Sequence, residues 1–241
     1  MNFEIIIDNI GMFVDGLWVT IHLIALSLVI GFSLSLPLAL IRHLKVPVAN
    51  QIIWSFTFFF RATPLLLQIY LIYFGTGQFS FFRDSFLWLF FKEAYLCALL
   101  AFTLNTTAYT TEILKGAFDN MRKKEIEAAL AFGMSKFSTY SRIIIPNSLR
   151  RSLPPYSNEV IFLLHSSSIA SVITVTELTG VAGYIYSKYY DPFTPYVTVA
   201  AVYIALVSII SLIFKLLEKK YLAHLRDSTQ TKIEVVAGNV N

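Results

Sequence analysis

An uninterrupted apolar run from Leu17 to Ile41 constrains the fold of this chain most. It contains no Asp, Glu, Lys or Arg over 25 residues, and about 20 apolar residues suffice for a helix to cross the hydrocarbon core of a bilayer. Gly31 and Pro37 within the run are tolerated in membrane helices, where neighbouring helices satisfy the freed backbone groups. The run therefore predicts a transmembrane helix.

The composition of the whole chain also indicates a membrane protein. Hydrophobic residues make up 56% of the 241 residues and charged residues only 14%, whereas soluble domains carry about 25% charged residues. The net charge of +4 does not indicate nucleic-acid binding, because the basic residues fall into islands between apolar runs. The residues before Leu17 contain no Lys or Arg, so we expect no cleavable signal peptide. Cys97, the single cysteine, is expected to be a packing residue.

Four further apolar runs predict additional membrane-spanning helices. Together with the first run they give spans over residues 17–41, 62–79, 94–114, 155–175 and 197–214. The predicted fold class is therefore an all-α membrane protein with five transmembrane helices. Residues 1–226 would form a single transmembrane domain, followed by a polar, disordered tail over residues 227–241.

The second apolar region allows two layouts, because Arg61 and the Thr63–Pro64 step interrupt it. One kinked helix could cross with Arg61 at mid-depth, which costs about 2.5 to 3.5 kcal/mol on insertion scales. Alternatively, residues 48–60 lie along the cytoplasmic interface and the crossing starts near Ala62. We prefer the second layout, which leaves Arg61 among the headgroups as an anchor or gating residue and puts Pro64 in a first helical turn.

The distribution of basic residues predicts the orientation of the spans. With the N-terminus outside, 15 of the 19 Lys and Arg residues fall in cytoplasmic segments, and only Arg83, Lys92 and Lys188 fall outside. Cytoplasmic loops of membrane proteins carry an excess of Lys and Arg. We therefore expect the C-terminus and the long basic loop 119–151 to lie in the cytoplasm.

No constellation typical of an enzyme occurs in the sequence. The chain lacks a G-x-x-x-x-G-K-[ST] loop, so it has no Walker-type site for ATP phosphates. Its four histidines lie far apart and show no spacing typical of metal ligands. We expect neither catalysis, nor a metal site, nor a cofactor bound by this chain.

The loop 119–151 contains residues whose spacing is typical of a helical hairpin. Small residues keep one face of a helix thin, so that the helix can lie in a groove of another protein. A glycine permits the left-handed turn that ends such a helix, and a proline would stop the helix that follows. The residues of this motif are Glu127, Ala128, Ala129, Gly133, Ile143 and Pro146.

This motif resembles the EAA loop of the membrane subunits of bacterial ABC importers, E-A-A-x3-G-x9-I-x-L-P, with Ile145 in place of the usual Leu. The resemblance extends to residues 60–68, 104–112 and 156–160. These segments are similar to the permeases of polar amino-acid importers, and most similar to the M-type permeases of arginine importers.

The resemblance implies a fold, a location and partners for the chain. The fold would be that of type I ABC importers in the bacterial inner membrane. The hairpin would be the coupling helix, docked on a cytoplasmic ABC ATPase dimer, and MgATP would be bound by that partner. A second permease subunit, identical or homologous, would complete the path, and an extracytoplasmic amino-acid-binding protein would deliver the solute.

Polar residues within the predicted spans are candidates for the solute path. Those on the third span recur at i, i+4 and i+7, so they share one face, and intramembrane polar faces point into a bundle. A carboxylate there could pair with a cationic solute, and serines could loosen the helix. Alternatively, these side chains only bond to neighbouring helices, which is how we interpret His165. The candidates are Asn105, Tyr109, Glu112, Asn158, Glu159, Ser166, Ser167 and Ser168.

We therefore predict a permease subunit of an ATP-driven importer for a polar, basic amino acid, arginine first and histidine or lysine next. A glutamine- or glutamate-type ABC permease is an alternative. Another is an ATP-independent channel or carrier, which would need ionisable pairs at mid-depth and no docking loop. A third is a membrane anchor or sensor whose hairpin binds some other cytoplasmic protein.

Overall fold

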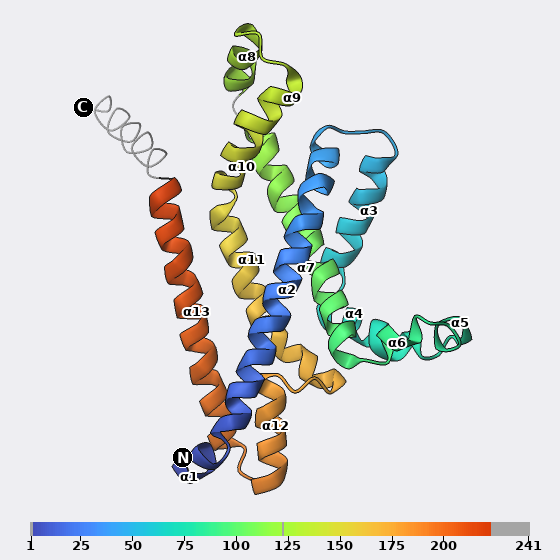
Figure 1. The fold of residues 1–241 in the computed structure, drawn as a ribbon, viewed down its shortest axis with the longest axis vertical. Helices are drawn as coiled ribbons and strands as arrows, with labels where there is room; N and C mark the ends of the chain where they lie inside the picture. Colours follow the sequence, from blue (N-terminus) through green and yellow to red (C-terminus); the bar gives the residue numbers. More distant parts are fainter. Residues whose placement is uncertain (1, 122, 223–241) are drawn as a thin grey trace, which may run out of the picture.

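A computed structural model describes residues 2–121 and 123–222, with the side chains of all except residues 123 and 124. All regular elements in this part of the chain are helical, as predicted, and most of them form one elongated bundle (Figure 1). The predicted tail over residues 227–241 lies outside the described residues.

The elements follow the chain in a simple order, with π-helical turns at η1 and η2 and a 3₁₀ helix at η3. They are α1 (Phe3–Asp8), α2 (Ile10–His43), α3 (Ala49–Ala62), α4 (Leu65–Tyr70), η1 (Leu71–Gly75), α5 (Ser80–Arg83), α6 (Trp88–Phe91), α7 (Ala94–Asp119), α8 (Lys123–Ala131), α9 (Lys136–Thr139), η2 (Tyr140–Ile144), α10 (Ile145–Arg151), α11 (Leu153–Ser166), η3 (Ser167–Ile173), α12 (Leu178–Tyr189) and α13 (Phe193–Tyr221).

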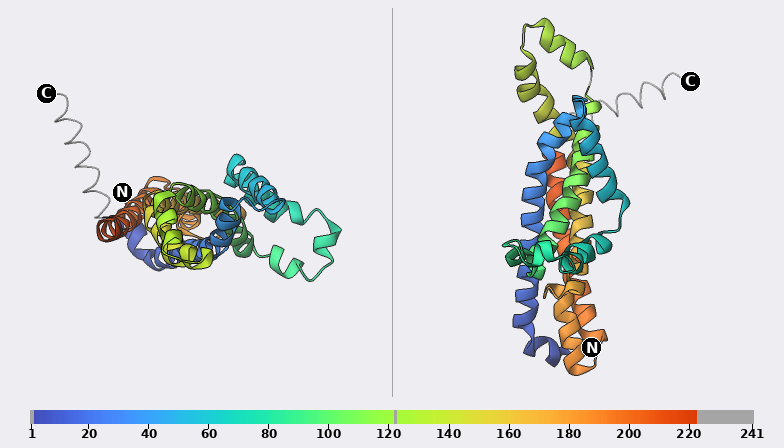
Figure 2. Two further views of the ribbon diagram at one scale, coloured as in Figure 1. Left: turned by 90° about the horizontal axis from the view of Figure 1, so that it is seen from above. Right: turned by 90° about the vertical axis from the view of Figure 1, so that its right-hand side faces the viewer.

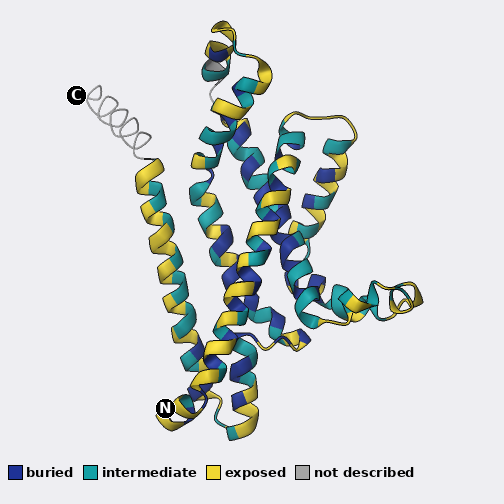
Figure 3. Cartoon of the chain, viewed as in Figure 1, coloured by how far each residue is buried: buried dark blue, intermediate teal, exposed yellow. Residues whose placement is uncertain are grey.

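The centre of the bundle is α7. α2, α3, α10 and α11 all pack against it, α2 most extensively, and the buried residues concentrate there in Figure 3. Two buried hydroxyls on α7 are satisfied within the helix, since Thr107 and Thr111 each donate to the carbonyl four residues earlier, whereas those of Thr103, Thr106 and Thr110 make no hydrogen bond with the described residues. α2 approaches closely at Gly31, where an added Cβ would overlap the Thr106 methyl group.

The candidate membrane spans are fewer than the predicted five. α2 and α13, which contain the predicted spans 17–41 and 197–214, are each long and apolar enough to cross a membrane. Two bent pairs could each form a broken span: α3 with α4–η1, and α11–η3 with α12. These give two to four spans by length and composition, and the number five stays a prediction.

The segment between α2 and α7 is broken at the predicted Thr63–Pro64 step, and the choice between the two predicted layouts stays a prediction. α3 runs beside α7 along the bundle (Figure 2), not across its end, and the chain then bends by 105° between α3 and α4. α4 and η1 cover residues 65–75 of the predicted span 62–79, and the crossing of the membrane by this segment stays a prediction. The bend lies at Thr63, with φ −102° and ψ 141°, because a residue before proline is driven out of the helical conformation.

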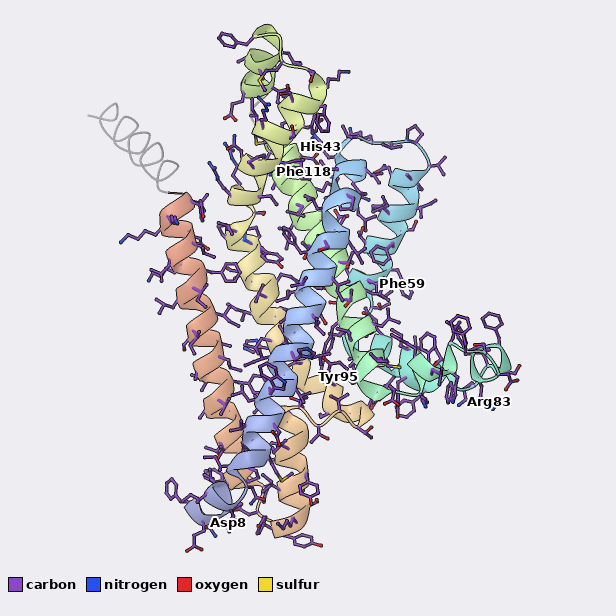
Figure 4. The ribbon with its side chains drawn as sticks, viewed as in Figure 1. Asp8, His43, Phe59, Arg83, Tyr95 and Phe118 are labelled. Atoms are coloured by element: carbon purple, nitrogen blue, oxygen red, sulfur yellow. The ribbon has the colours of Figure 1, made fainter. Side chains whose placement is uncertain are left out.

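Residues 76–93 form an arm that stands away from the bundle and carries α5 and α6 (Figures 1 and 2). Only the α6 end of the arm packs against α7. Phe81 and Phe86 are among its exposed aromatic side chains, and Arg83 marks the tip in Figure 4.

At one end of the bundle, α8 and α9 form the α8–α9 hairpin (residues 123–139). We call this end of the bundle the hairpin end. α9 continues through η2 and α10 towards α11, with Ser152 as the one intervening residue. The prediction that Pro146 stops the second helix is therefore wrong. Pro146 lies in the first turn of α10, where a missing N–H is harmless. The π-helical turn before it changes the pattern of backbone hydrogen bonds that a proline would otherwise interrupt.

Candidate functional site

The α8–α9 hairpin exposes a charged and apolar surface. Glu127 and Ala128 are exposed, and the Phe132 and Phe137 side chains are 89% and 82% exposed. Large apolar side chains gathered on an exposed surface mark interaction sites. Ala129, in contrast, is buried against its own chain. Only one of the two motif alanines is thus available to a partner.

Gly133 ends α8 as its position in the motif predicts. Its φ is +80°, a conformation that glycine adopts without steric cost. The Met134 N–H donates to the Ala129 carbonyl at 3.1 Å and the Gly133 N–H to the Leu130 carbonyl at 2.9 Å. This pair of bonds is the Schellman motif, and it fixes the corner between α8 and α9.

A hydrophobic cluster joins the hairpin to the ends of α2 and α7. Ile144 of η2 is buried together with Ala39 of α2 and with Leu114 and Phe118 of α7, and Ile143 packs against this group. Separating these residues would expose apolar surface at about 25 cal/mol per Å². The motif residue Ile143 is therefore part of the joint between the hairpin and the bundle.

Polar contacts strengthen the same joint. His43 Nδ1 lies 2.7 Å from Asp119 Oδ1, and Lys115 Nζ donates to Asp119 Oδ2 at 2.7 Å; His43 and Phe118 lie side by side in Figure 4. Partial burial raises the pKa of Asp119, but the hydrogen bonds from Lys115 and His43 outweigh it and hold the pKa below its ordinary value. An Arg151–Glu125 ion pair of 3.7 Å links α10 to α8.

Glu112, a predicted solute-path residue, is held by neighbouring helices. Its carboxylate lies 3.2 Å from Arg42 Nη2 of α2 and accepts a hydrogen bond of 2.8 Å from Thr57 Oγ1 of α3. These contacts support the structural alternative for Glu112, since its carboxylate ties α2, α3 and α7 together.

Asn105 also has a structural partner set. Its Nδ2 donates to Gln68 Oε1 at 3.1 Å and to the Phe60 carbonyl at 3.2 Å. Gln68 Nε2 donates to the carbonyls of Phe60 and Thr63 at 2.8 and 3.0 Å. Because the last carbonyls of a helix lack intrahelical partners, these two amides stabilise the break before Pro64. Gln68 carries this role without having been a predicted site residue.

Arg61 lies on an open face with other predicted residues. Its guanidinium carbon is 5.3 Å from the centroid of the Tyr109 ring, and that ring is 5.9 Å from the ring of Phe162. Asn158 and His165 occupy the same side of α11 at i−4 and i+3 from Phe162, and all three are exposed. We call these five residues the α7–α11 face.

Glu159 lies next to this face but is buried, with 5% of its surface exposed. Its Oε1 atom makes no hydrogen bond with the described residues. Thr106 of α7 and the charge of Arg61 both act on the carboxyl group. Glu159 makes no ion pair among the described residues, whereas Glu112 is paired with Arg42.

The three predicted serines mark a change of helix type. α11 ends at Ser166 and the 3₁₀ helix η3 starts at Ser167, while Ser167 and Ser168 each donate to the carbonyl three residues earlier. Such 3₁₀ turns are frequent at the C-terminal ends of α-helices, and η3 is capped at its C-terminus by Thr174, which has a left-handed conformation. Ser167 Oγ lies 3.1 Å from Tyr203 OH of α13.

Glu177 is a buried carboxylate that the motifs do not point to. Fully buried, it accepts hydrogen bonds from the N–H groups of Thr179 and Gly180 and from Tyr203 OH. It therefore caps α12 and links it to η3 and α13. Its position directly before a short helix, as an acidic N-cap, is the signal that could have identified it.

The residues described do not form an enzyme-like metal centre: within 2–121 and 123–222, no three His, Cys, Asp or Glu side chains are placed to hold a metal ion. The candidate site consists instead of the exposed α8–α9 hairpin and the open α7–α11 face. Apolar outer helices around such a face are typical of membrane proteins that handle polar solutes.

Comparison of the sequence identifies the family. Residues 28–222 match the family model described as the binding-protein-dependent transport system inner membrane component. The chain belongs to this family.

Several curated relatives are amino-acid permeases. The chain is 41% identical over 215 residues to the histidine/lysine/arginine/ornithine transport system permease protein HisM of Escherichia coli (strain K12), covering 89% of this chain and 90% of HisM. It is 40% identical over 188 residues to the nopaline transport system permease protein NocM of Agrobacterium fabrum, covering 78% of each chain.

Solved structures show the same fold. The chain matches the crystal structure of an amino acid ABC transporter with histidines at a TM-score of 0.81 and 30% identity, covering 91% of this chain and 99% of that one. It also matches the inward-facing MetNI methionine ABC transporter at a TM-score of 0.70 and 18% identity, covering 88% and 97%. The second likeness concerns the fold alone.

Proposed function

We propose that this chain is the permease subunit of an ATP-driven importer that moves a basic amino acid across the inner membrane, with the hairpin end in the cytoplasm. The α8–α9 hairpin carries this proposal. It presents exposed phenylalanines beside Glu127, and the buried Ile144 cluster joins it to the ends of α2 and α7. A surface both open to a partner and fixed to the spans suits the transmission of movement.

The partner at the hairpin is an ABC ATPase dimer, which binds and hydrolyses MgATP. The apolar rings of Phe132 and Phe137 would enter its cleft, and Glu127 would pair with a basic group at the rim. The motif residues Gly133 and Ile143 act indirectly, Gly133 by fixing the hairpin corner and Ile143 by packing at the joint. A binding protein would dock at the opposite end.

The solute path runs along the α7–α11 face. Two such faces, from this chain and from an identical or homologous second permease, would enclose the path. The solutes named for the HisM relative are histidine, lysine, arginine and ornithine, amino acids whose side chains carry basic nitrogen groups. Glu159, buried and with an unpaired oxygen, supplies the negative charge that such a side chain requires.

A charge and packing test at the hairpin addresses the coupling role. We expect Glu127→Lys and Phe132→Ser each to reduce both co-purification of the ATPase and uptake of labelled arginine by about tenfold, the effect of losing one interface anchor. Phe86→Ser is the matched control, because Phe86 is equally exposed, at 81%, on the arm far from the hairpin. Normal ATPase recovery and uptake in both hairpin variants would rule out the proposed docking.

A further inference from the structure

A pocket of about 330 Å³ opens at the hairpin end, between the α2–α3 connection and α7. Its lining contains three cations, two amides and a tryptophan: Arg42, Lys45, Lys115, Asn50, Gln51 and Trp54. None of these residues belongs to the coupling motif or to the α7–α11 face. No acidic side chain is among the described residues that line it, so the pocket surface is basic.

Arg42 is the most buried of the three cations that line the pocket. Its side chain is 7% exposed, and only its Nη2 atom reaches Glu112. The Nε and Nη1 atoms are buried and make no hydrogen bond with the described residues. Glu112 neutralises the guanidinium through this one contact, and Arg42 is one of the three cations in the pocket wall.

The neighbouring charges leave the pocket with a net positive charge. Glu112 takes one Arg42 nitrogen and Asp119 takes Lys115 Nζ, which leaves Lys45 without an ion pair among the residues described. Lys45 is exposed at the mouth of the pocket. A monoanionic phosphate group would therefore balance the charge.

The outer surface of α3 indicates where this phosphate group comes from. Trp54 at the pocket stacks on Phe58 at a centroid distance of 5.3 Å, and Ile52, Phe58 and Phe59 are exposed along α3; Phe59 is labelled in Figure 4. An aromatic ring at a basic pocket, continued by an apolar helix surface, is the pattern of a membrane interface. A headgroup in the pocket would place its acyl chains along this surface.

We propose that this pocket binds the phosphate of an anionic phospholipid headgroup, held by Lys45 at the mouth and attracted by the positive charge of Arg42 and Lys115 in the wall. Basic pockets at the cytoplasmic side of membrane helices bind such headgroups. The site needs only a membrane-embedded chain, so it does not depend on the proposed solute or on the docking of an ATPase. Free inorganic phosphate shares the chemistry and is distinguished by the test.

Trp54 provides the probe. In a Trp18→Phe, Trp88→Phe background it is the one remaining tryptophan of the three in the chain. The purified full-length chain, in phosphatidylcholine nanodiscs, would receive equal fractions of brominated phosphatidylglycerol or brominated phosphatidylcholine. We expect the brominated phosphatidylglycerol to quench Trp54 with about fivefold higher apparent affinity, the effect of one basic residue near an anionic lipid.

Two pocket variants and one control complete the test. Lys45→Gln and Arg42→Gln, which each remove one positive charge from the pocket, should abolish the preference, whereas Lys220→Gln on exposed α13 should keep it. Equal quenching by both lipids in the unmodified pocket overturns the proposal. Two results together would overturn the lipid assignment in favour of the free anion. Inorganic phosphate would abolish the preference for phosphatidylglycerol, and Trp54 emission would respond to phosphate when no phosphatidylglycerol is present.

Discussion

At the scale of single residues, the three buried or half-buried glutamates of the bundle have different surroundings. Glu112 is paired with Arg42 and Thr57, and Glu177 caps α12 and accepts from Tyr203. Glu159 keeps an unpaired oxygen beside the α7–α11 face. Because burying a carboxylate without a partner is unfavourable, a cationic solute would gain most by meeting Glu159.

We therefore expect Glu159→Gln to change which amino acids are transported. The variant keeps the shape of the side chain and removes its charge, so uptake of labelled arginine, lysine and histidine should fall by about tenfold or more, the worth of one charge-assisted hydrogen bond. Uptake of glutamine should fall less. The ratio of arginine to glutamine uptake by the assembled importer is the measurement.

The matched control is Glu112→Gln, which removes a carboxylate from the same bundle. We expect it to reduce thermal stability, because it leaves Arg42 without its partner, with the arginine-to-glutamine ratio preserved. An unchanged ratio in Glu159→Gln, or an equal change in both variants, would contradict a solute-binding role for Glu159.

The types of these residues are predictable from sequence, but their partners are not. The i, i+4, i+7 spacing of Asn105, Tyr109 and Glu112 predicts a shared face, yet the structure directs Asn105 to the break before Pro64 and Glu112 to Arg42. Both partners lie far away along the chain, where spacing within one helix carries no information. Only the assembled fold distinguishes a path residue from a bridge between helices.

At the scale of elements, the closest approach is that of α2 to α7. A Cβ at Gly31 would overlap the Thr106 methyl group, with the Thr107 backbone nitrogen only 3.4 Å away. Small residues that let backbones approach closely are the means by which membrane helices pack. α2 packs more extensively on α7 than any other helix does.

We expect Gly31→Ala to lower the stability of the detergent-solubilised protein by about 1 to 3 kcal/mol, the typical result of overpacking. Gly11→Ala is a control within the same helix, because a Cβ at Gly11 meets nothing within 4 Å; it should leave the melting temperature unchanged or raise it slightly. Thermal unfolding of both variants measures the difference. Equal melting temperatures would show that α2 and α7 are not packed this closely.

Helix positions follow from sequence better than helix breaks do. The apolar run 17–41 lies within α2, and Gly133 ends α8 through a backbone conformation that its residue type predicts. The two prolines show the limit. Pro64 follows a 105° bend, whereas Pro146 lies in a helical run, because a π-helical turn accommodates it. Such accommodation depends on packing around η2, which the local sequence does not reveal.

At the scale of the whole molecule, the two ends of the bundle differ in character. The α2–α3 connection lies at the hairpin end, and the α12–α13 connection lies at the opposite end near the N-terminus (Figure 1). The basic pocket and the hairpin share one end, which is the expected cytoplasmic side. This orientation is open to direct measurement, because Cys97 is fully buried and replacing it removes the one native thiol.

In a Cys97→Ser background we expect Val48→Cys to react with a membrane-impermeant maleimide in inside-out vesicles, and Tyr190→Cys to react in intact spheroplasts. The pair is matched, since both residues are exposed, at 74% and 85%, and both have positive φ values. Labelling of both positions from one side, or the reverse pattern, would contradict the proposed orientation.

A nearly unbroken helical run extends from α9 through η2, α10 and α11 to η3. It fixes the number of residues that can separate the hairpin from the bundle. A helix advances by about 100° and 1.5 Å per residue, so one residue inserted after Ile145 would turn the hairpin by that angle relative to Glu159. The arm 76–93 packs against the bundle at its α6 end. An insertion in the arm would not rotate the hairpin relative to Glu159. Length variation among related chains should therefore collect in the arm and be absent between Lys136 and Ile173.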